Sequence, residues 1–189
     1  MARIDTDCRL NQTDYEHVAL GTTNVADDGC AVCCLAMHLL SRLSDTITDE
    51  LKEDVVTIIA GSGFFNDAGE IYLPPQSQSV TVDSTSYTIG YSKTADIAAR
   101  ILEGKTGFVQ FMATLPKGTF VSHYVFVDGI DTTESDPLRK LLVVDPSDGE
   151  SKTLYEAMVD RYAFEKDDNG RPLTPSTTQL NSNFKCVFS

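Results

Sequence analysis

The chain has no long apolar run, and this lack excludes two classes of protein. Among its 189 residues, no stretch approaches the roughly 18 consecutive apolar residues of a membrane helix. The N-terminal residues Met1–Asp5 also lack the apolar region of a secretory signal. We therefore expect no membrane span and no signal peptide.

Positive charge is scarce as well. The chain has 15 Lys and Arg residues against 28 Asp and Glu residues, which gives a formal net charge of −13 at pH 7. Such a balance argues against a general affinity for nucleic acid or anionic lipid. It does not identify a substrate, because an acidic surface is also an ordinary route to solubility.

The cysteine pattern lacks what a disulfide scaffold or a zinc site needs. Five cysteines are an odd number, and Cys30, Cys33 and Cys34 are crowded together, which fits a reducing compartment. No second Cys-x-x-Cys or His-x-x-x-His pair completes a set of four zinc ligands. We expect no metal and no cofactor. A small metal site made of these three cysteines and His38 remains an alternative.

The composition is ordinary for a globular protein, with 41% hydrophobic and 23% charged residues. We expect one domain over residues 1–189. Spacing and turn residues predict helices at 30–43, 48–59, 94–103 and 154–158, and strands at 79–91, 107–112, 123–129, 141–145 and 183–188. The loop segments are 1–29, 61–78 and 166–182. Within them, Gly63–Gly69 resembles a loop that walls a substrate site, or else it is an ordinary exposed connection.

Cys30 opens the most strongly patterned helix of the chain. Asp27 and Asp28 could accept hydrogen bonds from its first N–H groups, and Gly29 allows a tight entry. Cys30 points away from the apolar face and lies in the first turn, where free N–H groups and the helix dipole favour a negative charge. A thiolate there would be a nucleophile. Alternatively, Cys30 is one more buried small residue.

Thiol catalysis also needs a base, a group that orients the base, and donors for the oxyanion. Of three histidines, His38 lies two helical turns from Cys30 and His17 is in an irregular segment, so His123 is the candidate base. It opens an apolar strand, where it could equally be a satisfied strand-end histidine.

Two further residues could complete the site. Asp145 ends the next strand and would lie beside His123 if the two strands pair, although Asp before Pro is also a common turn residue. Gln12 lies upstream of Cys30, and its side-chain N–H could join the Cys30 backbone N–H as an oxyanion donor.

The order of these residues resembles that in the papain-like cysteine peptidases. In particular, it is similar to the bacteriocin-processing (double-glycine) peptidases and their stand-alone relatives in bacteria and phages. The matching blocks are Asn11-Gln12, Leu20–Thr23, Gly29-Cys30, Leu35–Met37, Ser122–Gly129 and Val143–Gly149. The resemblance implies Cys30 as nucleophile, His123 as base, Asp145 as its orienter and Gln12 as oxyanion donor. It also implies an α+β fold, in which a helical half carrying Cys30 packs on an antiparallel sheet.

The resemblance has departures. Ala31–Cys34 stand where the family often has Gly-Pro-Thr-Ser, and Ser122 replaces the common Gly before the His. We expect no attached transporter domain, and therefore no leader cleavage coupled to secretion.

The expected function is a thiol hydrolase that cleaves a peptide or amide bond in a peptide or protein substrate. We expect a cytoplasmic or phage- or virion-associated location. The alternative is a catalytically silent binding or structural module on the same fold.

Overall fold

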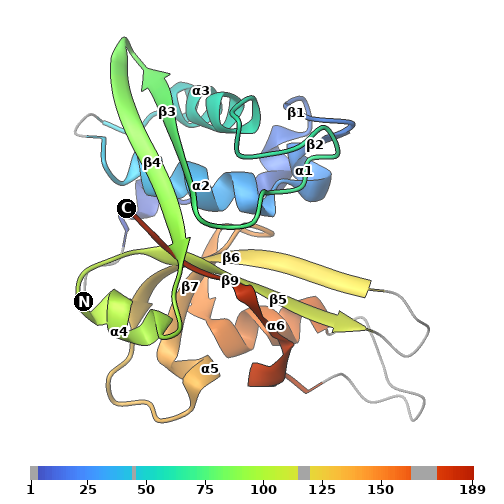
Figure 1. The fold of residues 1–189 in the computed structure, drawn as a ribbon, viewed down its shortest axis with the longest axis vertical. Coiled ribbons are helices and arrows are strands. Elements are labelled where there is room, and N and C mark those ends of the chain that lie inside the picture. Colours follow the sequence, from blue (N-terminus) through green and yellow to red (C-terminus); the bar gives the residue numbers. More distant parts are fainter. Residues whose placement is uncertain (1–3, 44–45, 115–119, 163–173) are drawn as a thin grey trace.

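The computed structural model describes residues 4–43, 46–114, 120–162 and 174–189. It has a mixed α+β architecture with a large antiparallel sheet and several helices (Figure 1). The expected α+β class is confirmed at this level. In the part of the chain that the structure describes, no helix is long and apolar enough to cross a membrane.

The large sheet holds seven strands in the described residues, and every neighbouring pair is antiparallel. Their order is β3-β4-β9-β5-β6-β7-β8. The bounds are Gln76–Val82 for β3, Thr85–Lys93 for β4, Gly107–Thr114 for β5, Phe120–Ile130 for β6, Leu141–Asp145 for β7, Glu150–Thr153 for β8 and Leu180–Phe188 for β9.

Helices cover both faces of this sheet (Figure 1). On one side lie α1 (Val25–Asp28), α2 (Cys30–Leu40) and α3 (Asp49–Ala60), and on the other lie α4 (Ile97–Leu102), α5 (Pro137–Lys140) and α6 (Leu154–Tyr162). The remaining elements are short: 3₁₀ turns η1 (Thr6–Cys8), η2 (Gln12–Tyr15) and η3 (Thr177–Gln179), and a two-stranded ribbon of β1 (Ala19–Leu20) and β2 (Thr23–Asn24).

The alternation of side chains along the central strands builds two hydrophobic cores. Phe108 and Phe126 face the core that contains α2 and α3, whereas their neighbours Val109 and Val125 face the core that contains α4 and α6. Because successive strand residues point to opposite faces, an apolar strand of this kind is buried on both sides. Because the sheet is packed on both faces, β6 and β7 hold their polar residues His123 and Asp145 in defined positions.

The segment before α2 is more ordered than predicted. Asn24 caps α1, and its side chain accepts the Asp27 N–H. Asp28 Oδ2 accepts from Thr23 Oγ1 at 2.7 Å, so the two acids belong to the short helix α1. Gly29 precedes α2 without any side-chain cap. The prediction that Asp27 and Asp28 cap the Cys30 helix is therefore wrong.

Several bounds also differ. Helix α2 ends at Leu40 and not at residue 43, and the predicted strand 79–91 is a hairpin of β3 and β4. Its turn residues Asp83 and Ser84 have φ angles of 47° and 66°, so the hairpin turns without a glycine. Strand β8 and helix α5 were not predicted. Of the predicted loop 166–182, residues 166–173 lie outside the described residues, and η3 and the start of β9 occupy its end.

Candidate active site

Cys30 lies where the sheet leaves one edge of β6 without a strand. Strand β7 pairs with β6 only between Phe126 and Ile130, so in the described residues the first half of β6 has β5 alone as a neighbour. The first turn of α2 reaches this edge, and the backbone N–H of Tyr124 donates a hydrogen bond to the Cys30 sulfur. The backbone N–H of Ala31 is a second donor to the same sulfur.

Gly29 makes this placement possible. A Cβ at position 29 would lie 2.4 Å from the carbonyl oxygen of Val25, which is a backbone atom and cannot move aside cheaply. The lack of a side chain therefore lets α1 and α2 approach closely and fixes the start of α2 at Cys30.

His123 and Asp145 form a buried pair beside the thiol. His123 Nε2 lies 2.6 Å from Asp145 Oδ1, and the two residues are only 2% and 1% exposed. The last residue of β7 that pairs with β6 is Val144, which lies opposite Phe126. Asp145 is the next residue, and it therefore lies diagonally across from His123 on the neighbouring strand. Since Asp145 occupies Nε2, the other ring nitrogen, Nδ1, is the one left for Cys30, to which His123 is hydrogen-bonded.

The carboxylate of Asp145 is itself held in place. Its Oδ1 accepts hydrogen bonds from the backbone N–H of Ser147 at 2.9 Å and from the Ser147 hydroxyl at 2.8 Å. The rings of Phe111 and His123 pack in an edge-to-face arrangement, with their centroids 5.6 Å apart. These contacts fix the orientation of the imidazole with respect to the thiol.

Burial disfavours a charge on each of these three groups, but their hydrogen bonds outweigh it. Burial raises the pKa of Asp145, whereas the hydrogen bonds from His123 and Ser147 lower it to about 2. Burial likewise lowers the pKa of His123, but Asp145 and Cys30 raise it to about 9. The pKa of Cys30 is lowered despite burial, chiefly by the hydrogen bond and the charge of His123. The arrangement therefore favours a thiolate and an imidazolium side by side.

The other cysteines lack such partners. Cys33 and Cys34 are fully buried in the core, and burial raises the pKa of both thiols. Burial also raises the pKa of Cys186 to about 12. Only Cys30, among the cysteines, is partly exposed.

Gln12 is brought to the same place by two hydrogen bonds. Its backbone N–H donates to the carbonyl of Pro146 at 2.7 Å, which ties η2 to the turn after Asp145. Its side-chain Nε2 donates to the carbonyl of Ala26, in α1, at 2.8 Å. An amide NH₂ has two N–H bonds, so one of them remains for another acceptor.

A cavity of about 600 Å³ opens onto these residues. Gln12, Cys30 and His123 line it, and Asp145 lies behind His123. The rest of the wall comes from α1, α2, residues 68–73, α6 and three strands, and comprises Asp27, Asp28, Ala31, Ala68, Gly69, Glu70, Ile71, Leu73, Gln110, Met112, Ser122, Tyr124, Arg161, Asn181 and Phe184. The structure thus brings all four predicted site residues together.

The wall contains residues that the sequence did not single out. The predicted wall loop contributes Ala68 and Gly69, but the wall continues through Leu73, which is 61% exposed. Gln110 Nε2 donates to the Ser122 hydroxyl at 2.6 Å, and Asn181 Nδ2 donates to the side-chain oxygen Oε1 of Gln110. A signal for Gln110 was present, because it is the one polar residue within the apolar run Phe108–Met112.

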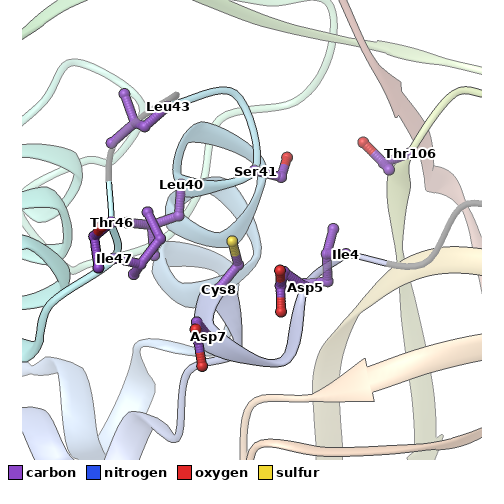
Figure 2. Close-up of a pocket in the computed structure, with 10 residues that line it drawn as sticks. All are labelled: Ile4, Asp5, Asp7, Cys8, Leu40, Ser41, Leu43, Thr46, Ile47 and Thr106. Carbon is purple, nitrogen blue, oxygen red and sulfur yellow. The ribbon is translucent and has the colours of Figure 1, made fainter.

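A second cavity, of about 560 Å³, lies near the end of α2 and contains Cys8 (Figure 2). Its lining residues are Ile4, Asp5, Asp7, Cys8, Leu40, Ser41, Leu43, Thr46, Ile47 and Thr106, and they include no histidine. Burial and the neighbouring charges of Asp5 and Asp7 raise the pKa of Cys8. This lining therefore lacks the groups that would activate the thiol.

The remaining histidines have structural surroundings. His38 stacks on Phe188, its Nδ1 lies 3.2 Å from the Thr106 hydroxyl, and burial lowers its pKa to about 3. His17 is exposed and lies 3.0 Å from Glu53. No group of three or more His, Cys, Asp or Glu side chains in the described residues is arranged to hold a metal ion. The three clustered cysteines and His38 therefore do not form a ligand set.

Comparisons of the chain with protein-family models, with curated proteins and with solved structures found no match. A partly exposed thiol, a charged imidazole, a buried carboxylate and an amide N–H around one cavity are together suited to attack on a carbonyl carbon.

Proposed function

We propose that this protein is a thiol hydrolase that cleaves a peptide or amide bond. One observation carries the proposal. Cys30 has a lowered pKa and is hydrogen-bonded to His123, and His123 Nε2 lies 2.6 Å from Asp145 Oδ1. A nucleophile, a base and a group that orients the base are thus connected in the order that the reaction needs.

The reaction would proceed in two halves. The Cys30 thiolate attacks the carbonyl carbon and forms a C–S bond, and the His123 imidazolium gives its proton to the leaving nitrogen as the C–N bond breaks. Water then attacks the thioester while His123 takes one proton from it, and the C–S bond breaks to restore the thiolate. Asp145 stabilises the charged ring in both halves.

Gln12 would stabilise the oxyanion. One of its Nε2 N–H bonds is used by Ala26, and this bond fixes the direction of the amide. The second N–H, together with the backbone N–H of Cys30, would donate to the oxygen that becomes negative in the transition state.

We also propose that the fold is of the papain-like class. A helical half that carries Cys30 packs on an antiparallel sheet that carries His123 and Asp145, in agreement with the resemblance of the sequence blocks. The departures leave the reacting groups unchanged, since Ala31 acts on the sulfur through its backbone N–H, and Cys33 and Cys34 are core residues.

A cleavage assay with two serine variants tests the proposed function. The purified protein is incubated with a mixture of unfolded proteins, and new N-termini are identified by mass spectrometry. We expect new N-termini with the wild type and with the control Cys8→Ser, and none above background with Cys30→Ser. Equal cleavage by Cys30→Ser would contradict the proposal. No cleavage by any form, with an unreactive Cys30, would favour the catalytically silent module.

A further inference from the structure

Three carboxylates without a cationic partner line the cavity beside Cys30. They belong to Asp27 and Asp28, at the end of α1, and to Glu70, in the wall segment. Their hydrogen-bond partners are neutral, namely Asn24, Thr23 and Asn66 respectively. None of the three takes part in an ion pair among the described residues.

A second observation at the same cavity is the orphaned acceptor of Gln12. This residue is only 9% exposed, and its buried Oε1 has no hydrogen-bond partner among the described residues. A buried acceptor without a donor is costly, so a ligand that brings N–H groups would be favoured there. The observation is independent of the carboxylates and calls for a hydrogen-bond donor, which the charged end of a lysine or arginine side chain provides.

The wall also offers apolar surface next to the carboxylates. Ile71 and Leu73 follow Glu70 in the lining, and Leu73 is one of the few large hydrophobic side chains that are exposed in the described part of the chain. Lysine and arginine have long apolar stems that end in a charged group with N–H donors. Their stems match Ile71 and Leu73, and their charged ends match the carboxylates.

Opposing charge in this cavity is limited. Arg161 is the one Lys or Arg residue in the described lining, and the pair of Cys30 and His123 adds no net charge when both are ionised. The wall therefore carries an excess of negative charge, and a cleft lined by one sign of charge concentrates ligands of the opposite sign.

We propose that the enzyme selects peptide substrates that carry a lysine or arginine side chain next to the scissile bond. Asp27, Asp28 and Glu70 are the specificity-determining residues. This inference rests on the proposed function and names its substrate class.

The test uses three peptide acyloxymethyl ketones that differ only in the residue beside the ketone, which is lysine, norleucine or glutamate. The thiolate displaces the carboxylate leaving group and forms a thioether, so the second-order rate of inactivation reports binding beside Cys30. At low ionic strength we expect the lysine probe to react about tenfold faster than the norleucine probe, because the cleft attracts a cation. The glutamate probe is expected to be the slowest, and 0.5 M NaCl should reduce the preference through screening.

Two double variants isolate the cavity carboxylates from the overall charge. Asp28→Asn with Glu70→Gln is expected to reduce the ratio of lysine to norleucine rates to about threefold or less, since each exposed charge pair contributes little singly. The control, Glu50→Gln with Asp54→Asn, removes the same charge from exposed residues of α3 outside the cavity lining and should keep the tenfold ratio.

Iodoacetamide separates failure of this inference from failure of the proposed function, because it is small and uncharged. It should modify Cys30 at the same rate in the wild type and in both double variants. If it does, and the lysine probe is no faster than the norleucine probe, the basic specificity is overturned while the thiol chemistry stands. If Cys30 reacts with neither iodoacetamide nor any probe, the proposed function itself fails.

Discussion

At the scale of single residues, the site depends on three groups that would each be neutral if buried alone. Burial opposes the charge on Cys30, His123 and Asp145, and it is outweighed chiefly by the hydrogen bonds and charges that the three groups share, with further hydrogen bonds from Ser147, Tyr124 and Ala31. Removing one member should therefore change the protonation of the other two. This coupling is the property that mutation and pH can test.

Replacing Asp145 by Asn should lower turnover without abolishing it. The amide keeps the size of the carboxylate and can still accept from Ser147, but it removes the charge that raises the pKa of His123. By comparison with carboxylates in similar roles, we expect turnover to fall by about 10²- to 10⁴-fold. A cleavage assay combined with thermal melting measures both effects. A large fall in melting temperature with unchanged activity per folded molecule would make Asp145 a turn residue only.

Gln12→Ala should act on the transition state. Loss of one oxyanion donor typically costs about 100-fold or more in turnover, or roughly 3 kcal/mol. With a substrate that has norleucine in place of lysine, we expect the Michaelis constant and the rate of Cys30 alkylation by iodoacetamide to stay nearly unchanged, and Gln12→Glu to be no better than Ala. A raised Michaelis constant with normal turnover would instead make Gln12 a binding or loop residue.

The pH dependence should differ between cleavage and alkylation. The pKa of Cys30 is lowered, so the thiolate is lost as pH falls through that pKa, and both rates decrease on the acid side. The pKa of His123 is raised to about 9, so the proton donor for the leaving nitrogen is lost above that pH. Cleavage should therefore fall on both sides, whereas alkylation by iodoacetamide should not fall above pH 9. A cleavage rate that stays constant through pH 10 would contradict the role of His123.

At the scale of the elements, the junction between α1 and α2 decides where the thiol lies. Gly29→Ala should destabilise the protein by about 1–3 kcal/mol, as overpacking does, because its Cβ would meet the Val25 carbonyl. It should also slow the alkylation of Cys30 by displacing the first turn of α2. The matched control is Gly61→Ala, after α3, where a Cβ would meet its nearest atom at 3.4 Å. Urea denaturation should show a change of less than about 1 kcal/mol for the control, and equal losses would contradict this account.

Elements were predictable where local signals agreed with tertiary packing. The strand Leu141–Asp145 matches its prediction, and α3 lies within one residue of it at either end, with Thr48 as its cap. The hairpin turn at Asp83 and Ser84 was missed because neither residue is a glycine, although both adopt positive φ. Helix α1 was missed because its four residues are too few to show a period.

At the scale of the whole molecule, the last strand joins parts that are distant in the sequence. Strand β9 lies between β4 and β5 and pairs with both. The sequence predicted a closing strand at 183–188, but its place in the centre of the sheet could not be predicted, because local patterns do not show which distant strands pair. The same limit applies to the cavity wall, where Glu70, Gln110 and Asn181 line one cavity because of the fold and share no motif.

The central position of β9 predicts a global effect of Phe188→Ala. Phe188 is 2% exposed and contacts the rings of His38, Phe108 and Phe126. Truncation of a buried Phe costs about 3–5 kcal/mol, and we expect one cooperative loss of stability in urea denaturation. Leu102→Ala, at a residue that is 60% exposed, is the control and should change stability by less than about 0.5 kcal/mol. A similar small change for Phe188→Ala would contradict the packing described here.

The predicted catalytic residues came from sequence blocks whose order could be compared with a known pattern, whereas their contact depends on three structural facts. Strand β7 stops before the first half of β6, α2 starts at Cys30, and the turn after Asp145 holds the backbone of Gln12. The start of α2 at Cys30 was predicted from the sequence. The other two facts do not follow from periodicity, since each concerns where one element lies relative to another.

The most direct test of the central claim is the titration of the Cys30 thiol itself. Thiolate absorbance near 240 nm is measured against pH for the wild type minus Cys30→Ser, and again in a His123→Ala background. We predict that the wild-type thiolate forms below the ordinary pKa of 9.0, and that this shift is lost when His123 is removed. A Cys30 that titrates at or above 9.0 in the wild type, or that titrates identically without His123, would contradict the proposed ion pair.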